Sequence, residues 1–325
     1  MAASYTFEDY SGAATSLSDN PYDGLIETCH NDPKEIQSRY DTHRTARTEQ
    51  QKKKLLSAEF EGVVIDQILK RLEDPLEPDY KDPRHCLVFW ARPPQEVKEV
   101  IAEVQRRLKT VAPNLWTMPQ SSLHMTALEI THSLTAPEIN ALVSQIEPHM
   151  AAITDYSYEN PQCRARLVKP SLSFDAQALA LSFLPAAGED LPSASASEGR
   201  RTAEADTYTY HHLRRDLFSM ASATGVKVAS RYVVPSAHLT VARFIESKDF
   251  ETADGEVDGG KVAELVEVIE GINQWLKEEF WPVDGEEGKK KGLAWVVGEE
   301  KGFDSRQGAL WYGSGGETVR LGKGF

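Results

Sequence analysis

Two short stretches of the chain repeat one pattern. Residues 121–130 read SSLHMTALEI and residues 235–244 read PSAHLTVARF, and each holds a histidine, one apolar residue and a threonine. Successive side chains of a β-strand point to opposite faces. In a strand, histidine and threonine therefore share one face and the alternating apolar residues share the other. The pattern predicts two related strands, each buried on one face and polar on the other.

Helices flank both stretches in the expected secondary structure. Apolar periodicity predicts helices within 93–113 and over about 135–152, 206–223 and 261–280. Short apolar runs predict strands at 85–91, 164–175, 178–186, 293–300 and 309–315, and the second His-x-Thr strand lies within 226–246. Each half then has the order helix, His-x-Thr strand, helix. Pro119 and Ser121 also precede His124 much as Pro235 and Ser236 precede His238. We expect an α+β fold that arose by a diverged internal duplication.

Composition divides the chain into an arm, an extension and a main domain. Residues 1–32 are polar without an apolar period and predict a disordered arm or one that lies on the surface. Residues 33–83 predict a helical extension, most clearly over 44–73. The main domain is expected over 84–325, with lobes at about 84–186 and 206–325. Between the lobes, 187–205 is rich in Ser, Ala and Glu and predicts a flexible insertion.

Charge and cysteine content exclude several classes of protein. The net charge is −14, which argues against a protein that coats nucleic acid along an extended basic track. The three cysteines show no CxxC spacing, so neither a disulfide framework nor a thiolate metal site is expected. His211 and His212 are neighbours, which is not the spacing of a helical metal pair. No apolar run reaches the roughly 18 residues that cross a bilayer, and the start MAASYTFEDYSG lacks the order of a signal peptide. We expect a cytoplasmic or nuclear protein without a metal or cofactor.

Two imidazoles and two hydroxyls around one groove suit displacement at phosphorus. The attacking and leaving oxygens lie on opposite sides of the phosphoryl group. One histidine accepts a proton from water on one side while the other donates a proton to the departing oxygen. Threonine hydroxyls donate hydrogen bonds to the non-bridging oxygens. The pattern does not decide which histidine is the acid and which the base.

The paired HMTA and HLTV motifs resemble the 2H phosphoesterase superfamily, and within it the fungal branch described as RNA ligase or cyclic nucleotide phosphodiesterase-like. The resemblance covers roughly residues 84–325. It implies a bilobal duplicated fold with two antiparallel sheets that line a central groove and helices outside. It also implies catalytic roles for His124 and His238, and phosphate binding by Thr126 and Thr240. The expected substrate is a cyclic phosphate, either a 2′,3′-cyclic nucleotide or RNA end or ADP-ribose 1″,2″-cyclic phosphate, opened without a metal.

Five further residues are candidates for substrate contact. Tyr232, Trp116, Trp311 and Tyr312 could stack a nucleobase, although packing explains most such aromatic residues. Arg243 lies three residues after Thr240 and points to the opposite face of a regular strand, unless a bulge turns it toward phosphate. Alternative functions are trimming of RNA ends, 2′-5′ RNA ligation, or binding without catalysis. The acidic charge favours a small substrate, and the oligomeric state stays open.

Overall fold

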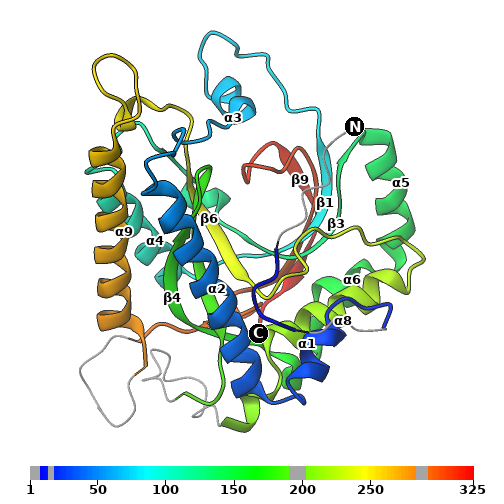
Figure 1. Cartoon of the computed structure of the whole chain (residues 1–325). Coiled ribbons are helices and arrows are strands. Elements are labelled where there is room, and N and C mark those ends of the chain that lie inside the picture. The colour runs from blue at the N-terminus through cyan, green and yellow to red at the C-terminus, as the bar shows by residue number, and fades with distance from the viewer. Residues whose placement is uncertain (1–7, 14–17, 190–202, 283–291) are drawn as a thin grey trace.

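The computed structural model describes residues 8–13, 18–189, 203–282 and 292–325 and has an α+β fold with two antiparallel sheets (Figure 1). The first sheet has the strand order β3-β1-β8-β9 and the second β2-β6-β5-β4-β7. The strands of the first sheet are β1 (His85–Ala91), β3 (Met125–Leu134), β8 (Lys301–Gly308) and β9 (Gly316–Lys323). Those of the second are β2 (Trp116–Thr117), β4 (Arg166–Phe174), β5 (Ala178–Pro185), β6 (Ala237–Arg243) and β7 (Trp295–Val296). The predicted α+β class and pair of antiparallel sheets are confirmed.

The sheets do not follow the two lobes expected at 84–186 and 206–325. Strand β8 pairs with β1, so the end of the chain completes the sheet that its first strands begin. In the other sheet, β6 pairs with β5, which again joins the two halves of the sequence. Apolar periodicity marks where a strand lies but not which strand it pairs with. The two expected lobes are therefore not separate structural units.

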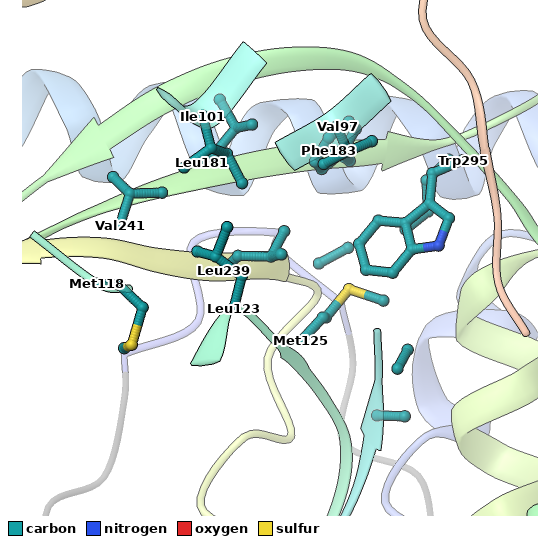
Figure 2. Close-up of a cluster of buried hydrophobic side chains, with 14 of the residues drawn as sticks. Val97, Ile101, Met118, Leu123, Met125, Leu181, Phe183, Leu239, Val241 and Trp295 are labelled. Carbon is teal, nitrogen blue, oxygen red and sulfur yellow. The ribbon is translucent and has the colours of Figure 1, made fainter. Parts of the chain in front are cut away.

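Four helices flank the His-x-Thr strands as the sequence predicts. They are α4 (Gln95–Leu108), α5 (Ala136–Ile146), α8 (Tyr210–Ser222) and α9 (Gly259–Phe280). On α4, a single apolar face is buried, made of Val97, Val100, Ile101, Val104 and Leu108. Figure 2 shows Ile101 beside Leu181 and Val97 beside Phe183, both of β5. Leu239 of β6 and Met125 of β3 lie below them. One hydrophobic core therefore connects the helices with strands of both sheets.

Two predicted helices are interrupted. The helix predicted over 135–152 is in fact α5, a 3₁₀ turn over Glu147–His149, and then α6 (Met150–Thr154). The helix is interrupted because Pro148 has no amide N–H to continue the α-helical hydrogen bonds. The short helix α7 (Tyr156–Glu159) follows. The helix predicted over 44–73 is not continuous, because α2 (Pro33–Leu55) ends at Leu55 and α3 (Gln67–Leu72) begins only at Gln67. There the chain is non-helical, and the Val64 amide donates instead to the Ala176 carbonyl.

The N-terminal arm is part of the packed structure where it is described, so the expected disorder is wrong for residues 18–32. It forms α1 (Asp23–Thr28), and Tyr22, Leu25 and Cys29 are buried in the main core. The Asn20 amide donates to the Arg215 carbonyl and to Ser219, both on α8. Residues 22, 25, 26 and 29 have helical spacing, a signal that the polar composition concealed.

Other segments differ in extent from the expected ones. Within 226–246, the predicted His-x-Thr strand is β6 and the residues before it form a loop. Residues 309–315, expected to be a strand, connect β8 to β9. Of the predicted insertion 187–205, residues 190–202 lie outside the described residues, as do 1–7 and 14–17 of the arm. Within the described ranges, no helix is both long and apolar enough to span a membrane.

Candidate functional site

His124, Thr126, His238 and Thr240 line one pocket. Thr126 lies on β3 of the first sheet, and His124 is the residue directly before the start of β3. His238 and Thr240 lie on β6 of the second sheet. The alternating residues on both strands are buried, as predicted: Leu123, Met125, Ala127, Ala237, Leu239 and Val241. The apolar face of each strand thus fixes the polar pair on the side of the pocket.

The imidazole of His124 is held in one tautomer and one orientation. Its Nδ1 lies 2.7 Å from the Ser122 carbonyl oxygen, which only accepts hydrogen bonds, so Nδ1 carries the proton. The ring stacks on Trp90 of β1 with centroids 3.8 Å apart and an interplanar angle of 21°. The partner is Ser122, not the Ser121 that the sequence comparison aligned with Ser236. Neutral His124 therefore keeps a lone pair on Nε2.

His238 has a similar arrangement with a different partner. Its Nδ1 lies 2.9 Å from the Ser236 hydroxyl oxygen, two residues earlier in the chain. A hydroxyl both donates and accepts, so this contact allows either tautomer and the imidazolium. The Tyr232 ring lies 5.7 Å from the imidazole, centroid to centroid. Each histidine is thus oriented by the residue two positions before it.

Burial lowers the pKa of both histidines, to about 3 for His124 and about 4 for His238. Nearby cations contribute to this lowering, among them Arg92 for His124 and Arg47 and Arg214 for His238. Both imidazoles are therefore neutral at pH 7 in the ligand-free protein. The same cations create a field that favours an anion in the pocket.

A bulge follows the threonine in both strands. Along β6, Thr240 pairs with Ala180 but Ala242 pairs with the adjacent Leu179, so Val241 is the extra residue. Along β3, Thr126 pairs with Trp90 but Leu128 pairs with the adjacent Phe89. Such a bulge reverses the alternation of faces. The side chain three residues after each threonine consequently lines the pocket, namely Arg243 on β6 and Glu129 on β3.

Of the five expected substrate contacts, Tyr232, Arg243 and Trp311 line the pocket, whereas Trp116 and Tyr312 do not. Trp116 meets Tyr312 edge to face, with ring centroids 6.5 Å apart. The Tyr312 hydroxyl donates to Asp66 at 2.7 Å, and Asp66 also accepts from Arg243 at 3.3 Å. Trp116 and Tyr312 thus belong to the packing that supports Arg243.

Glu129, Arg231 and Trp90 are pocket residues that the sequence interpretation missed. Glu129 is 3% exposed and forms an ion pair with Arg231 at 2.7 Å. A carboxylate within the apolar run ALEI was the available signal, because a buried charge needs a partner. Arg231 and Trp90 gave no comparable local signal.

The buried histidines of α8 have structural partners. His211 contacts the Tyr40 hydroxyl and the Tyr22 carbonyl, each at 2.9 Å, and His212 contacts Asn31 at 2.6 Å. In the part of the chain that the structure describes, no three His, Cys, Asp or Glu side chains are grouped as metal ligands would be. The expectation of a metal-free site stays a prediction.

No protein-family model matches the chain, and none of the curated proteins matches it in sequence.

Proposed function

We propose that the protein is a phosphodiesterase that opens a cyclic phosphate by general acid–base catalysis with His124 and His238. One observation carries this proposal: two histidines and two threonines from strands of different sheets line the same pocket. The substrate class is a 2′,3′-cyclic nucleotide or RNA end, or ADP-ribose 1″,2″-cyclic phosphate. Polar side chains from both strands stand beside Trp90, Tyr232 and Trp311 in the lining of the pocket, a mixture that suits a small molecule.

In the proposed reaction, water attacks phosphorus in line with the ring oxygen that departs. A neutral imidazole accepts a proton from the water as the new P–O bond forms. The other imidazole, protonated, donates its proton to the leaving ribose oxygen as the old P–O bond breaks. One water molecule is added, and the product is a phosphomonoester with a free hydroxyl. The hydroxyls of Thr126 and Thr240 donate to the non-bridging oxygens where negative charge develops.

The low histidine pKa values require that a proton enters with the substrate. With pKa values of about 3 and about 4, neither imidazole is charged at neutral pH in the free protein. A bound phosphate anion raises the pKa of an adjacent imidazole because it stabilises the charged form. The acid is therefore generated in the complex and not before it.

The duplicated fold of the 2H phosphoesterases is part of this proposal. Its support is the repeated order α4–β3–α5 and α8–β6–α9 and the bulge after the threonine in both β3 and β6. The same irregularity at the same motif position in two strands is economically explained by a common ancestor of the two halves.

The alternatives are trimming of RNA ends, 2′-5′ RNA ligation and binding without catalysis. Enzymes that grip a long strand have a basic groove, and a chain of net charge −14 favours a small substrate instead. Two oriented imidazoles in one pocket favour catalysis over simple binding.

The test is turnover of 2′,3′-cyclic nucleotides and ADP-ribose 1″,2″-cyclic phosphate by purified protein in the presence of EDTA. We expect His124→Ala and His238→Ala each to lower kcat by about 10²–10⁴-fold. His149→Ala is the matched control, since His149 is exposed and lies outside the pocket. Absence of turnover by folded wild-type protein contradicts the proposal, and loss of activity with EDTA contradicts its metal-independent form.

A further inference from the structure

One end of the pocket is built around Arg231. This end is formed by Glu129 of β3, Arg231 from the loop before β6, and Trp311 from the loop between β8 and β9. Apolar or weakly polar side chains complete its wall, namely Cys86, Val88 and Leu310. None of these residues has a role in the proposed acid–base chemistry.

The guanidinium of Arg231 is fixed on two sides. Its Nε and Nη2 donate to the two carboxylate oxygens of Glu129 at 3.0 and 2.7 Å. Its plane also lies over the Trp311 ring, 4.4 Å from the centroid. The side chains of Arg231 and Glu129 are only 15% and 3% exposed. A guanidinium held in this way binds a ligand with little further loss of side-chain freedom.

The pair with Glu129 uses one edge of the guanidinium and leaves another edge available. An arginine has five N–H groups, of which Nη1 carries two and Nη2 two. Among the described residues, no acceptor is bonded to Nη1 of Arg231. Nη1 of Arg231 is therefore a donor at this end of the pocket for which a ligand can supply an acceptor.

The charge of the cluster distinguishes between possible ligands. Glu129 neutralises Arg231, and its carboxylate repels a second phosphate group. Two adjacent neutral acceptors suit the remaining N–H groups of Arg231 better than a phosphate does. Guanine presents such a pair, O6 and N7, to which arginine donates two hydrogen bonds. Adenine presents an amino donor in place of O6, so one of the two guanidinium N–H groups would face another donor.

Thr126 and Glu129 are spaced along β3 so that one nucleotide could contact both the phosphate-binding end of the pocket and the Arg231 end. Thr126 and Glu129 lie on the same side of the strand because of the bulge between them. Three residues of strand separate them by roughly 10 Å. That distance leaves room for a ribose between the phosphate at Thr126 and a base at Arg231.

We propose that Arg231, oriented by Glu129 and Trp311, selects a guanine base in the substrate. This inference rests on the proposed phosphodiesterase activity and assigns the base preference of the same pocket. Guanosine 2′,3′-cyclic phosphate is then the preferred nucleotide, with its phosphate between the two histidines and its base at Arg231.

The experiment compares kcat/KM for guanosine and adenosine 2′,3′-cyclic phosphates. We expect a preference for guanosine of at least about tenfold. The double variant Arg231→Gln with Glu129→Gln removes both charges together, so no unpaired buried charge is left to disturb folding. It should lose the preference, chiefly because KM for the guanosine substrate rises. Arg106→Gln, 66% exposed on α4, is the matched arginine control and should keep the preference.

Calorimetric binding of guanosine and adenosine 3′-monophosphates separates this inference from the proposed function. Turnover without a base preference overturns the role of Arg231 and leaves the phosphodiesterase intact. If folded protein turns over neither substrate, the proposed function fails. In that case tighter binding of the guanosine monophosphate, lost in the double variant, still supports guanine selection. Equal or absent binding of the two monophosphates overturns it.

Discussion

The imidazoles of His124 and His238 are neutral in the free protein, although arginine side chains lie near both of them. Each imidazole has one nitrogen fixed by a residue two positions earlier. Burial lowers both pKa values, and Arg92 and Arg214 contribute to this lowering. The protein therefore holds positive charge near the pocket without protonating the histidines themselves. A bound anion stabilises the imidazolium and so raises the pKa of a histidine beside it.

Sulfate binding should take up protons. Sulfate resembles phosphate but does not itself titrate between pH 5 and 8, so any proton uptake belongs to the protein. We expect affinity to fall as pH rises, because the free histidine pKa values are about 3 and about 4 and the bound anion raises them. Each unit of increase in pKa strengthens binding at low pH by about tenfold. Calorimetry at pH 6 in two buffers of different ionisation enthalpy measures the uptake.

His238→Gln should reduce this proton uptake, whereas His149→Gln should not. Equal binding enthalpies in the two buffers would show that sulfate binds without protonating either histidine, and the proposed generation of the acid in the complex would then be wrong.

At the scale of elements, the N-terminal arm supports the loop that leads into β6. Arg214 of α8 donates through Nη1 to the Val234 carbonyl at 2.9 Å and through Nη2 to the Tyr22 hydroxyl at 3.0 Å. Tyr22, directly before α1, in turn donates to the Tyr232 carbonyl at 3.4 Å. The supported loop carries Tyr232 and Ser236, which flank His238. The arm is therefore connected to the pocket by buried hydrogen bonds.

Tyr22→Phe should lower activity more than its effect on stability explains. The variant removes one acceptor from the buried Arg214, which costs about 1–3 kcal/mol of unfolding free energy. Because the loop then loses a support, we also expect kcat/KM for a cyclic nucleotide to fall several-fold at temperatures where the variant is fully folded. Tyr10→Phe is the control, since its hydroxyl bonds to Gln50 on α2. Unchanged kinetics in Tyr22→Phe would remove the link between arm and pocket.

Across the whole molecule, buried neutral histidines connect stability to pH. His211 is 2% exposed and its pKa is lowered to about 3, chiefly by burial. Its two ring nitrogens bond to the Tyr40 hydroxyl and the Tyr22 carbonyl, an arrangement that suits the neutral ring. His212 also has a lowered pKa, of about 4. These side chains join the arm, α2 and α8, so the N-terminal region depends on their staying neutral.

The protein should lose stability between pH 6.5 and pH 4. Unfolded histidine has a pKa near 6.5, so the unfolded state binds more protons in this range and stability falls as pH falls. His211 alone contributes up to about 1.4 kcal/mol per pH unit. Urea unfolding at pH 7 and pH 5 measures the slope. His211→Gln should be less stable at pH 7 but show a shallower pH dependence, and an unchanged slope would contradict this assignment.

The sequence by itself determined the local features of the fold and part of the site. Alternation in 121–130 and 235–244 predicted which side chains are buried, and periodicity predicted the four flanking helices. These features depend on neighbours within a few residues, and burial of one face is a property of the local pattern. The same alternation placed His124, Thr126, His238 and Thr240 on the polar faces of their strands.

Only the tertiary structure decided which distant residues meet. The pairing of β8 with β1, the Glu129–Arg231 contact and the packing of Tyr22 against α8 join segments far apart in sequence. The bulges that bring Glu129 and Arg243 into the pocket depend on strand pairing, because a bulge exists only relative to a partner strand. Such contacts are set by the topology of the whole chain, which local periodicity does not encode.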